Sequence, residues 1–102
     1  MIISGVRIVN QTAIEYFKRK HPNSRKPLDL WVKVTRSSEW KMFFDIKKTF
    51  NSVDKIKNKK DKFCFDIKGN DYRLIVVIKF QFSTVKIEHV FTHSEYEKWN
   101  KK

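Results

Sequence analysis

The sequence predicts an α+β fold, in which a small antiparallel β-sheet carries helices packed on one face. Two observations predict this class. After a short β-branched segment, the first half of the chain spaces its apolar residues as helices do, whereas the second half alternates apolar and polar residues as strands do. The length of 102 residues fits one domain over residues 1–102, with a three-stranded meander and an additional N-terminal strand.

The chain opens with a predicted strand and a first helix. Residues 2–9 are mainly apolar and β-branched, which favours a strand. Thr12 and Glu15 have the spacing of a capping box, and cations at residues 18–20 suit the C-terminal end of a helix dipole. The sequence therefore predicts a helix over residues 12–20, which Pro22 stops.

Two more helices are predicted before the middle of the chain. Ser24 is placed to cap the second helix, which residues 37–38 end, and residues 40–50 predict a shorter third helix. The side chains expected on their buried faces are Leu28, Leu30, Trp31 and Val34 in the second helix and Phe43, Phe44 and Ile46 in the third.

Residues 51–61 interrupt this pattern. The segment is polar, carries four lysines between Lys55 and Lys60, and has only Val53 and Ile56 as apolar residues. It is typical of a mobile, basic surface loop.

A hairpin follows the loop. Gly69 and Asn70 tolerate the backbone angles of a two-residue turn, which places Ile67 opposite Tyr72 and Asp66 opposite Arg73. In that register one face of the hairpin is apolar and predicts a core. Its members are Phe63, Phe65, Ile67, Tyr72, Leu74, Val76, Ile78 and Phe80.

The third strand of the meander is predicted over residues 85–91, after a turn near residues 81–84. Thr92 and Glu95 then form a second capping-box pattern, which predicts a terminal helix that contains Tyr96 and Trp99.

The charge balance gives the chain a strong positive field. There are 23 Lys+Arg against 11 Asp+Glu, a net charge of +12 and a pI of about 10.0. A hydrophobic content of 40% excludes a disordered basic tail, so we expect a folded domain that attracts nucleic acid, an anionic membrane or an acidic protein. No apolar run approaches the ~20 residues of a membrane span, and no helix pairs its cations with a free apolar stripe, which disfavours the membrane.

Location and cofactors follow from a few residue types. One cysteine, Cys64, favours a reducing compartment, and Arg7 interrupts the stretch where a signal peptide would be apolar, so we expect a cytoplasmic protein. The three histidines lack metal-ligand spacing, and the chain has no glycine-rich phosphate loop. We therefore expect neither a metal nor a small-molecule cofactor.

Candidate catalytic residues lie around the start of the terminal helix. His93 would be the first residue of that helix, Tyr96 lies one turn later, and Arg73 projects from the central strand. Together with lysines, these groups can cleave RNA without a metal by moving protons and stabilising a charged phosphorane. Structural roles remain open for each: Arg73 can pair with Asp66, His93 can face solvent, and Tyr96 can close the edge of a core.

Several segments resemble toxins of the HigB type, a branch of the RelE/ParE superfamily. The similar segments are VRIV at 6–9, KHP at 20–22, WK at 40–41, DIK at 45–47, FDIKGNDYRL at 65–74 and THSEY at 92–96. The resemblance implies a RelE-like fold, a small sheet with helices on one side. It also implies an mRNA endonuclease that acts without metal, commonly at the translating ribosome, and is neutralised by a HigA-type helix-turn-helix antitoxin.

The resemblance also assigns roles to residues. His93 is implied as general acid or base, Arg73 as a phosphate and transition-state stabiliser, and Tyr96 as a stacking or proton-handling group. Candidate RNA contacts are Lys57, Lys60, Lys62, Lys68 and Lys79.

One position departs from the resemblance. Glu88 stands about where similar toxins often carry an arginine. If it faces the site, it disfavours phosphate binding there or makes a carboxylate the base, and if it faces solvent, it has no effect on the site. Two other functions stay open: a non-catalytic basic module that binds RNA or the ribosome, and a ParE-like toxin directed at DNA gyrase.

Overall fold

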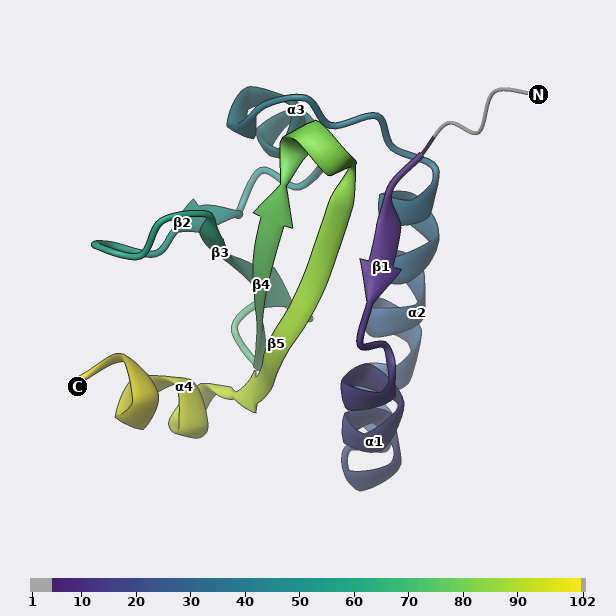
Figure 1. Cartoon of the computed structure of the whole chain (residues 1–102). Helices are drawn as coiled ribbons and strands as arrows, with labels where there is room; N and C mark the ends of the chain where they lie inside the picture. Colours follow the sequence, from purple (N-terminus) through teal and green to yellow (C-terminus); the bar gives the residue numbers. More distant parts are fainter. Residues whose placement is uncertain (1–4, 102) are drawn as a thin grey trace.

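A five-stranded sheet forms the centre of the fold over residues 5–101, the part of the chain that the computed structural model describes (Figure 1). The strands lie in the order β1-β5-β4-β3-β2, with β1 parallel to β5 and all other pairs antiparallel. Their bounds are Arg7–Val9 for β1, Asp54–Lys55 for β2, Lys62–Ile67 for β3, Tyr72–Lys79 for β4 and Thr84–Thr92 for β5. The predicted meander and N-terminal strand are confirmed, although residues 2–4 of the predicted first strand lie outside the described residues.

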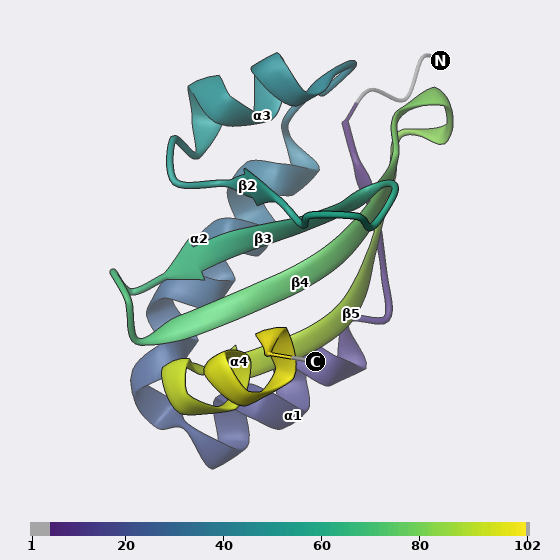
Figure 2. The same ribbon diagram turned by 90° about the vertical axis from the view of Figure 1, so that its left-hand side faces the viewer.

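Four α-helices accompany the sheet in the described part of the chain. They are α1 (Thr12–Lys20), α2 (Arg25–Arg36), α3 (Phe43–Thr49) and α4 (His93–Asn100), with 3-10 turns at Pro22–Ser24 and Phe80–Phe82. Helices α1 and α2 lie behind the sheet and α4 lies in front of it (Figure 2). The predicted layer of helices on one face is thus formed by α1 to α3, and α4 crosses one end of the opposite face.

The hairpin between β3 and β4 has the predicted register. Ile67 pairs with Tyr72 and Asp66 with Arg73, and the amide of Asp71 donates to the carbonyl of Lys68 at 3.1 Å. Gly69 has φ +62°, which glycine adopts without steric cost. Because the register is as predicted, the apolar face of the hairpin points toward the core.

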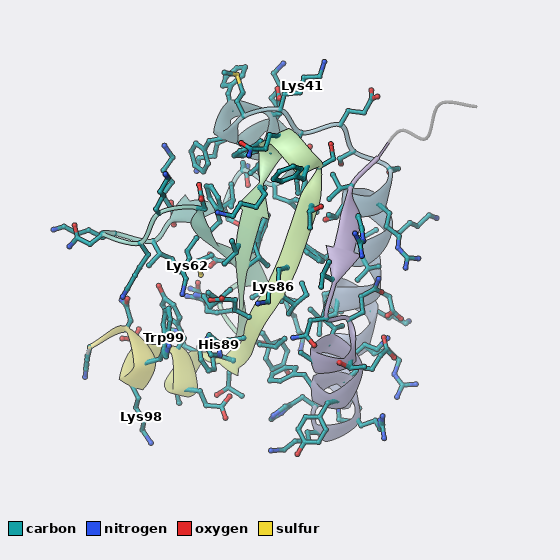
Figure 3. The ribbon with its side chains drawn as sticks, viewed as in Figure 1. Lys41, Lys62, Lys86, His89, Lys98 and Trp99 are labelled. Carbon is teal, nitrogen blue, oxygen red and sulfur yellow. The ribbon has the colours of Figure 1, made fainter. Side chains whose placement is uncertain are left out.

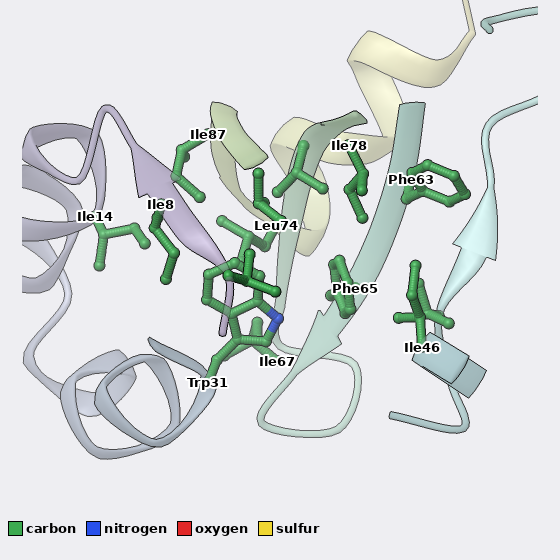
Figure 4. Packing of buried hydrophobic residues seen from close by; sticks show 14 of the residues in the cluster. Ile8, Ile14, Trp31, Ile46, Phe63, Phe65, Ile67, Leu74, Ile78 and Ile87 are labelled. Carbon is green, nitrogen blue, oxygen red and sulfur yellow. The ribbon is translucent and has the colours of Figure 1, made fainter. Parts of the chain in front are cut away.

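The core lies between that face and helices α1 to α3 (Figure 4). Trp31 of α2 packs edge-on against Phe65 of β3, with ring centroids 5.3 Å apart, and both residues are 1% exposed. The hairpin residues predicted for the core are buried, except that Tyr72 and Phe80 are partly buried at its margin.

The prediction that Leu30 and Phe44 belong to the core is wrong. Leu30 is 59% exposed and Phe44 is 61% exposed. Leu30 lies two positions after Leu28, and residues two apart do not share a helix face. Helix α3 begins at Phe43 rather than at residue 40, because the Asp45 carboxylate accepts the amides of Lys41 and Met42 at 2.9 and 3.3 Å.

Local corrections also apply to the first two helices. The capping box of Thr12 and Glu15 is wrong: Gln11 occupies the N-cap position, and Glu15 instead pairs with Lys18 at 2.9 Å. Ser24 precedes α2 as predicted, but its hydroxyl donates to the carbonyl of His21 at 2.7 Å rather than capping the helix.

The basic loop contains a strand that the sequence pattern did not predict. Val53 is fully buried and anchors the chain, so that Asp54 and Lys55 pair with Cys64 and Phe63 as β2. Lysines 57, 59 and 60 follow in the exposed turn that leads to β3.

Candidate functional site

The sheet face opposite the core carries the predicted site, and we call it the site face. Side chains directly opposite each other in a sheet point to the same side, so the register defines its members. The face includes Lys62, Cys64 and Asp66 of β3, Arg73, Ile75 and Val77 of β4, and Lys86, His89 and Phe91 of β5. Helix α4 covers one end of this face, where Cys64 and Ile75 are buried.

A β-bulge in β5 shapes the face. Ile75 pairs with His89 but Val76 pairs with Ile87, which leaves Glu88 without a partner directly opposite. The extra residue reverses the alternation and turns His89 toward the site face. A sequence signal for this bulge exists, since the apolar positions of the strand shift from odd-numbered Val85 and Ile87 to even-numbered Val90.

Arg73 is nearly buried, at 9% exposure, and is held by the hairpin. Its Nε lies 3.1 Å from a carboxylate oxygen of Asp66. Nη1 donates to the carbonyls of Asn70 and Tyr72 at 3.1 and 3.2 Å, and Nη2 donates to the Asn70 side-chain oxygen at 3.2 Å. Since a guanidinium has five N–H donors, the protein occupies most of its hydrogen-bonding capacity.

Tyr96 is the residue that α4 places over this arginine. The guanidinium carbon lies 5.4 Å from the centre of the Tyr96 ring, within the range of a cation–π contact. Burial chiefly raises the pKa of the Tyr96 hydroxyl, with the nearby Cys64 as a further cause. The hydroxyl is therefore protonated at neutral pH and can donate a hydrogen bond or a proton.

Cys64 lies beneath Tyr96 on the central part of the sheet. The thiol is buried, and this burial, reinforced by the carboxylate of Asp66, raises its pKa to about 11. A neutral thiol in this position packs as a small apolar group and contacts the Tyr96 hydroxyl.

His93 begins α4, as predicted, and the capping box that starts this helix is confirmed. The Thr92 hydroxyl accepts the Glu95 amide at 3.2 Å, while the Thr92 amide donates to the Glu95 carboxylate at 2.8 Å. The His93 side chain is half exposed, and its Nε2 lies 3.4 Å from a carboxylate oxygen of Glu97.

The positive end of the helix dipole at the start of α4 favours an anion. Its first amides are largely engaged within the protein, because His93 N–H donates to the carbonyl of Asp71 at 2.9 Å and Glu95 N–H donates to Thr92. The Glu95 carboxylate itself occupies the position of an anion at this helix end. The imidazole of His93, rather than the helix amides, is thus the group available to a ligand.

Of the five predicted RNA-contacting lysines, Lys62 and Lys79 lie on the site face, since Lys79 is two residues beyond Val77 on β4 and therefore points to the same side. The Lys62 ammonium pairs with Glu88 at 2.8 Å. Lys79 pairs with Asp61 at 2.7 Å, and Lys68 pairs with Asp71 at 3.4 Å beside the hairpin turn. Lys57 and Lys60 are exposed in the loop that follows β2, and Lys57 lines a pocket there together with Trp99 and Asn100 of α4.

Glu88 points to the site face, which answers the question raised by its departure from similar toxins. Lys62 lowers the pKa of the Glu88 carboxyl by hydrogen bonding and charge, so the carboxylate is ionised at neutral pH. Its negative charge is paired with Lys62, so Glu88 adds no unpaired negative charge to the site face.

An aromatic cluster that the sequence pattern did not predict lies between β5 and α4. His89 stacks on Phe91 with ring centroids 4.9 Å apart, and Trp99 lies 5.5 and 5.6 Å from these two rings. Figure 3 shows Trp99 of α4 beside His89 of β5, near Lys62. The bulge at Glu88 and the three-residue spacing of Tyr96 and Trp99 on α4 bring these rings together.

Residues 5–101 contain neither a metal-binding cluster nor a membrane-spanning helix. No three His, Cys, Asp or Glu side chains in this range gather closely enough to hold a metal ion. In the same residues, no helix has both the length and the apolar character needed to cross a membrane.

Comparisons with known proteins agree with this architecture. Residues 24–99 match a family model described as HigB_toxin, RelE-like toxic component of a toxin-antitoxin system. The mRNA interferase HigB of Escherichia coli O6:H1 (strain CFT073) is 25% identical over 93 residues, which cover 91% of this chain and 90% of that protein. The mRNA interferase toxin HigB of Escherichia coli K12 is 24% identical over 92 residues, or 90% and 88% of the two chains.

A solved structure shows the same fold. The crystal structure of the archaeal RelE–RelB complex from Pyrococcus horikoshii OT3 contains a chain that superimposes with a TM-score of 0.55 at 14% identity. The match covers 90% of this chain and 97% of that one. Because the family model spans most of the sequence and the fold agrees, this chain belongs to the HigB toxin family, the RelE-like toxic components of toxin–antitoxin systems.

Proposed function

We propose that the protein is an endoribonuclease toxin that cleaves mRNA, without a metal, on the site face beneath α4. The observation that carries this proposal is the stack of Tyr96 on Arg73 beneath α4, on a face that also carries His89 and Lys62. Relatives named mRNA interferase support mRNA as the substrate. We propose further that cleavage takes place in the cytoplasm on mRNA at the translating ribosome.

The chemistry needs two proton transfers and one cationic group. A base removes the proton of a ribose 2′-hydroxyl, the 2′-oxygen bonds to the adjacent phosphorus, and the bond from phosphorus to the 5′-oxygen breaks as an acid protonates that oxygen. We assign the acid or base role to His93 and proton donation or stacking to Tyr96. Arg73 provides positive charge beneath the Tyr96 ring and stabilises the phosphorane.

The test is cleavage of a reporter mRNA by the purified toxin, with and without translating ribosomes and with EDTA present. We expect 5′ ends that depend on the toxin, that EDTA leaves unchanged, and that ribosomes increase. His93→Ala, Tyr96→Phe and Arg73→Ala should each lower the rate by at least ~100-fold, as loss of an acid–base or electrostatic group does. His21→Ala, at the end of α1 beside Phe17, is the matched histidine control.

Other results would separate the rival functions. RNA binding without any cleavage indicates a non-catalytic module, and DNA damage on expression indicates a gyrase-directed toxin. Full activity in both His93→Ala and Arg73→Ala, with folding confirmed by circular dichroism, would refute the assigned site.

We also propose that a HigA-type helix-turn-helix antitoxin neutralises this toxin. Family membership supports an antitoxin partner, and the net charge of +12 favours an acidic segment on that partner. Co-expression with the helix-turn-helix protein encoded beside the toxin gene should restore growth and give a stable complex. Growth arrest that persists despite a well-expressed neighbour would contradict this pairing.

A further inference from the structure

Trp99 differs from the other two tryptophans in its surroundings. Trp31 and Trp40 are 1% and 4% exposed and belong to the core. Trp99 is half-buried on α4, a helix in which no residue is fully buried. A large, partly open aromatic ring beside basic side chains is a candidate contact surface for a ligand.

The indole has one side packed and another side that lines a pocket. It packs near His89, Phe91 and Tyr96, with centroid distances of 5.5, 5.6 and 6.1 Å. The pocket, of about 450 Å³, lies between α4 and the loop after β2, and its lining residues are Ile56, Lys57, Asn58, Lys59, Trp99 and Asn100. That volume falls in the usual range for ligand sites, about 300–1,000 Å³.

The lining combines the two features that bind single-stranded nucleic acid. An aromatic ring offers a surface on which any base can stack, and lysines attract the phosphates on either side of that base. The pocket borders the candidate catalytic cluster, because Trp99 follows Tyr96 by one turn of α4 and contacts His89 of β5. A nucleotide bound here would extend the chain that crosses the site face.

We infer that this pocket binds a nucleobase of single-stranded RNA, stacked on Trp99, with the adjoining phosphates held by Lys57 and Lys59. The inference rests on the proposed ribonuclease function, and it assigns to Trp99 the positioning of the substrate. An acidic peptide is the alternative occupant, but stacked rings and an open indole favour a flat base over carboxylate side chains.

The experiment uses the full-length toxin and a 2′-O-methyl oligonucleotide, which lacks the nucleophilic hydroxyl and is not cleaved. An otherwise identical abasic oligonucleotide removes the bases and keeps the phosphates. Affinities are measured by fluorescence anisotropy for wild type, Trp99→Ala, Trp99→Phe and Phe44→Ala. Phe44 is a matched control, since it is an exposed aromatic ring with Lys48 4.9 Å from its centre on α3, a helix outside the site face.

We expect wild type to bind the intact oligonucleotide about tenfold or more tightly than the abasic one. Trp99→Ala should abolish this difference, Trp99→Phe should retain part of it, and Phe44→Ala should behave as wild type. Intact oligonucleotide should also quench the tryptophan fluorescence of wild type, because a base stacks on Trp99. The quenching reports on Trp99 alone, since Trp31 and Trp40 are shielded in the core. The quenching assay needs no variant, so it remains decisive if Trp99→Ala does not fold.

Equal affinity for the intact and abasic oligonucleotides, absence of quenching, or no binding of free oligonucleotide overturns the inference. So does an acidic peptide that quenches Trp99 while RNA does not. The outcomes separate this inference from the proposed function. If the protein cleaves mRNA but binds the intact and abasic oligonucleotides equally, only the Trp99 site is refuted. If it binds the intact oligonucleotide more tightly but cleaves no mRNA, only the ribonuclease function is refuted.

Discussion

Arg73 is the single residue that connects most parts of the candidate site. Its guanidinium binds the hairpin turn through Asn70, pairs with Asp66 and lies beneath Tyr96. Lysine would keep the charge but lose the planar fork and leave buried acceptors unsatisfied. We expect Arg73→Lys to reduce cleavage at least ~10-fold and to destabilise the fold by about 1–3 kcal/mol.

Paired measurements of unfolding by urea and of cleavage rate check this prediction. Arg36→Lys, at the exposed end of α2, is the control and should change neither quantity. Wild-type activity and stability in Arg73→Lys would show that charge alone accounts for the role of this residue.

Cys64 provides a second test at the scale of a residue. Burial raises the pKa of this thiol to about 11, so at pH 8 the native protein holds at least ~100-fold less thiolate than an unfolded chain does. We expect the native protein to react with Ellman's reagent at least ~100-fold more slowly than the urea-unfolded protein, with the rate rising about tenfold per pH unit between pH 7 and 10. Rapid native labelling at pH 7 would contradict the burial of this thiol beneath Tyr96.

At the scale of elements, the capping box that begins α4 holds the helix in place over the site face. Thr92 and Glu95 satisfy each other's amides, and the rest of the helix has no fully buried residue to anchor it. Thr92→Ala should cost about 1 kcal/mol and free the helix start, whereas Thr92→Ser should retain the cap. Hydrogen exchange of the α4 amides is the measurement, and unchanged protection in Thr92→Ala would show that ring packing alone fixes the helix.

The elements also show how far local patterns determine this structure. Register in the β3–β4 hairpin and the start of α4 follow from short-range chemistry, the turn at Gly69 and the box at Thr92, and both are predicted correctly. By contrast, the pairing of β2 depends on the burial of Val53, a tertiary contact that no local pattern encodes.

Some residues of the candidate site likewise follow from local sequence patterns, and others depend on tertiary structure. Arg73 and Tyr96 come from the two well-predicted elements, and the structure brings them into contact. His89 and Trp99 meet only because the bulge at Glu88 reverses the face of β5, and strict alternation assigns His89 to the core side. Whether His93, Arg73 and Tyr96 are catalytic stays a prediction.

At the scale of the whole molecule, the net charge of +12 is distributed unevenly, and the position of each charge decides what it does. Several lysines are paired, including Lys62 with Glu88 and Lys79 with Asp61, whereas Lys57 and Lys59 line the pocket beside Trp99. The logarithm of RNA affinity should fall linearly with the logarithm of salt concentration. Replacing Lys57 and Lys59 with alanine should lower that slope by about 0.7 for each lost phosphate contact.

The matched control for this prediction changes the same net charge elsewhere. Lys26 and Lys33 are exposed on α2, behind the sheet, and their replacement by alanine should leave the slope near the wild-type value. Equal slopes for the two double variants would mean that RNA binding depends on the net charge of the whole protein rather than on the lysines beside Trp99.

Cleavage of cellular mRNA by a group on the site face is the central claim, and mapping of mRNA 5′ ends tests it most directly. The toxin is induced in cells, 5′ ends are sequenced across the transcriptome, and the His93→Ala, Arg73→Ala and His21→Ala variants are induced at equal protein levels. New 5′ ends within translated regions should appear for wild type and His21→Ala and be lost in the other two variants. Growth arrest without new 5′ ends, or equal cleavage by all four proteins, would contradict it.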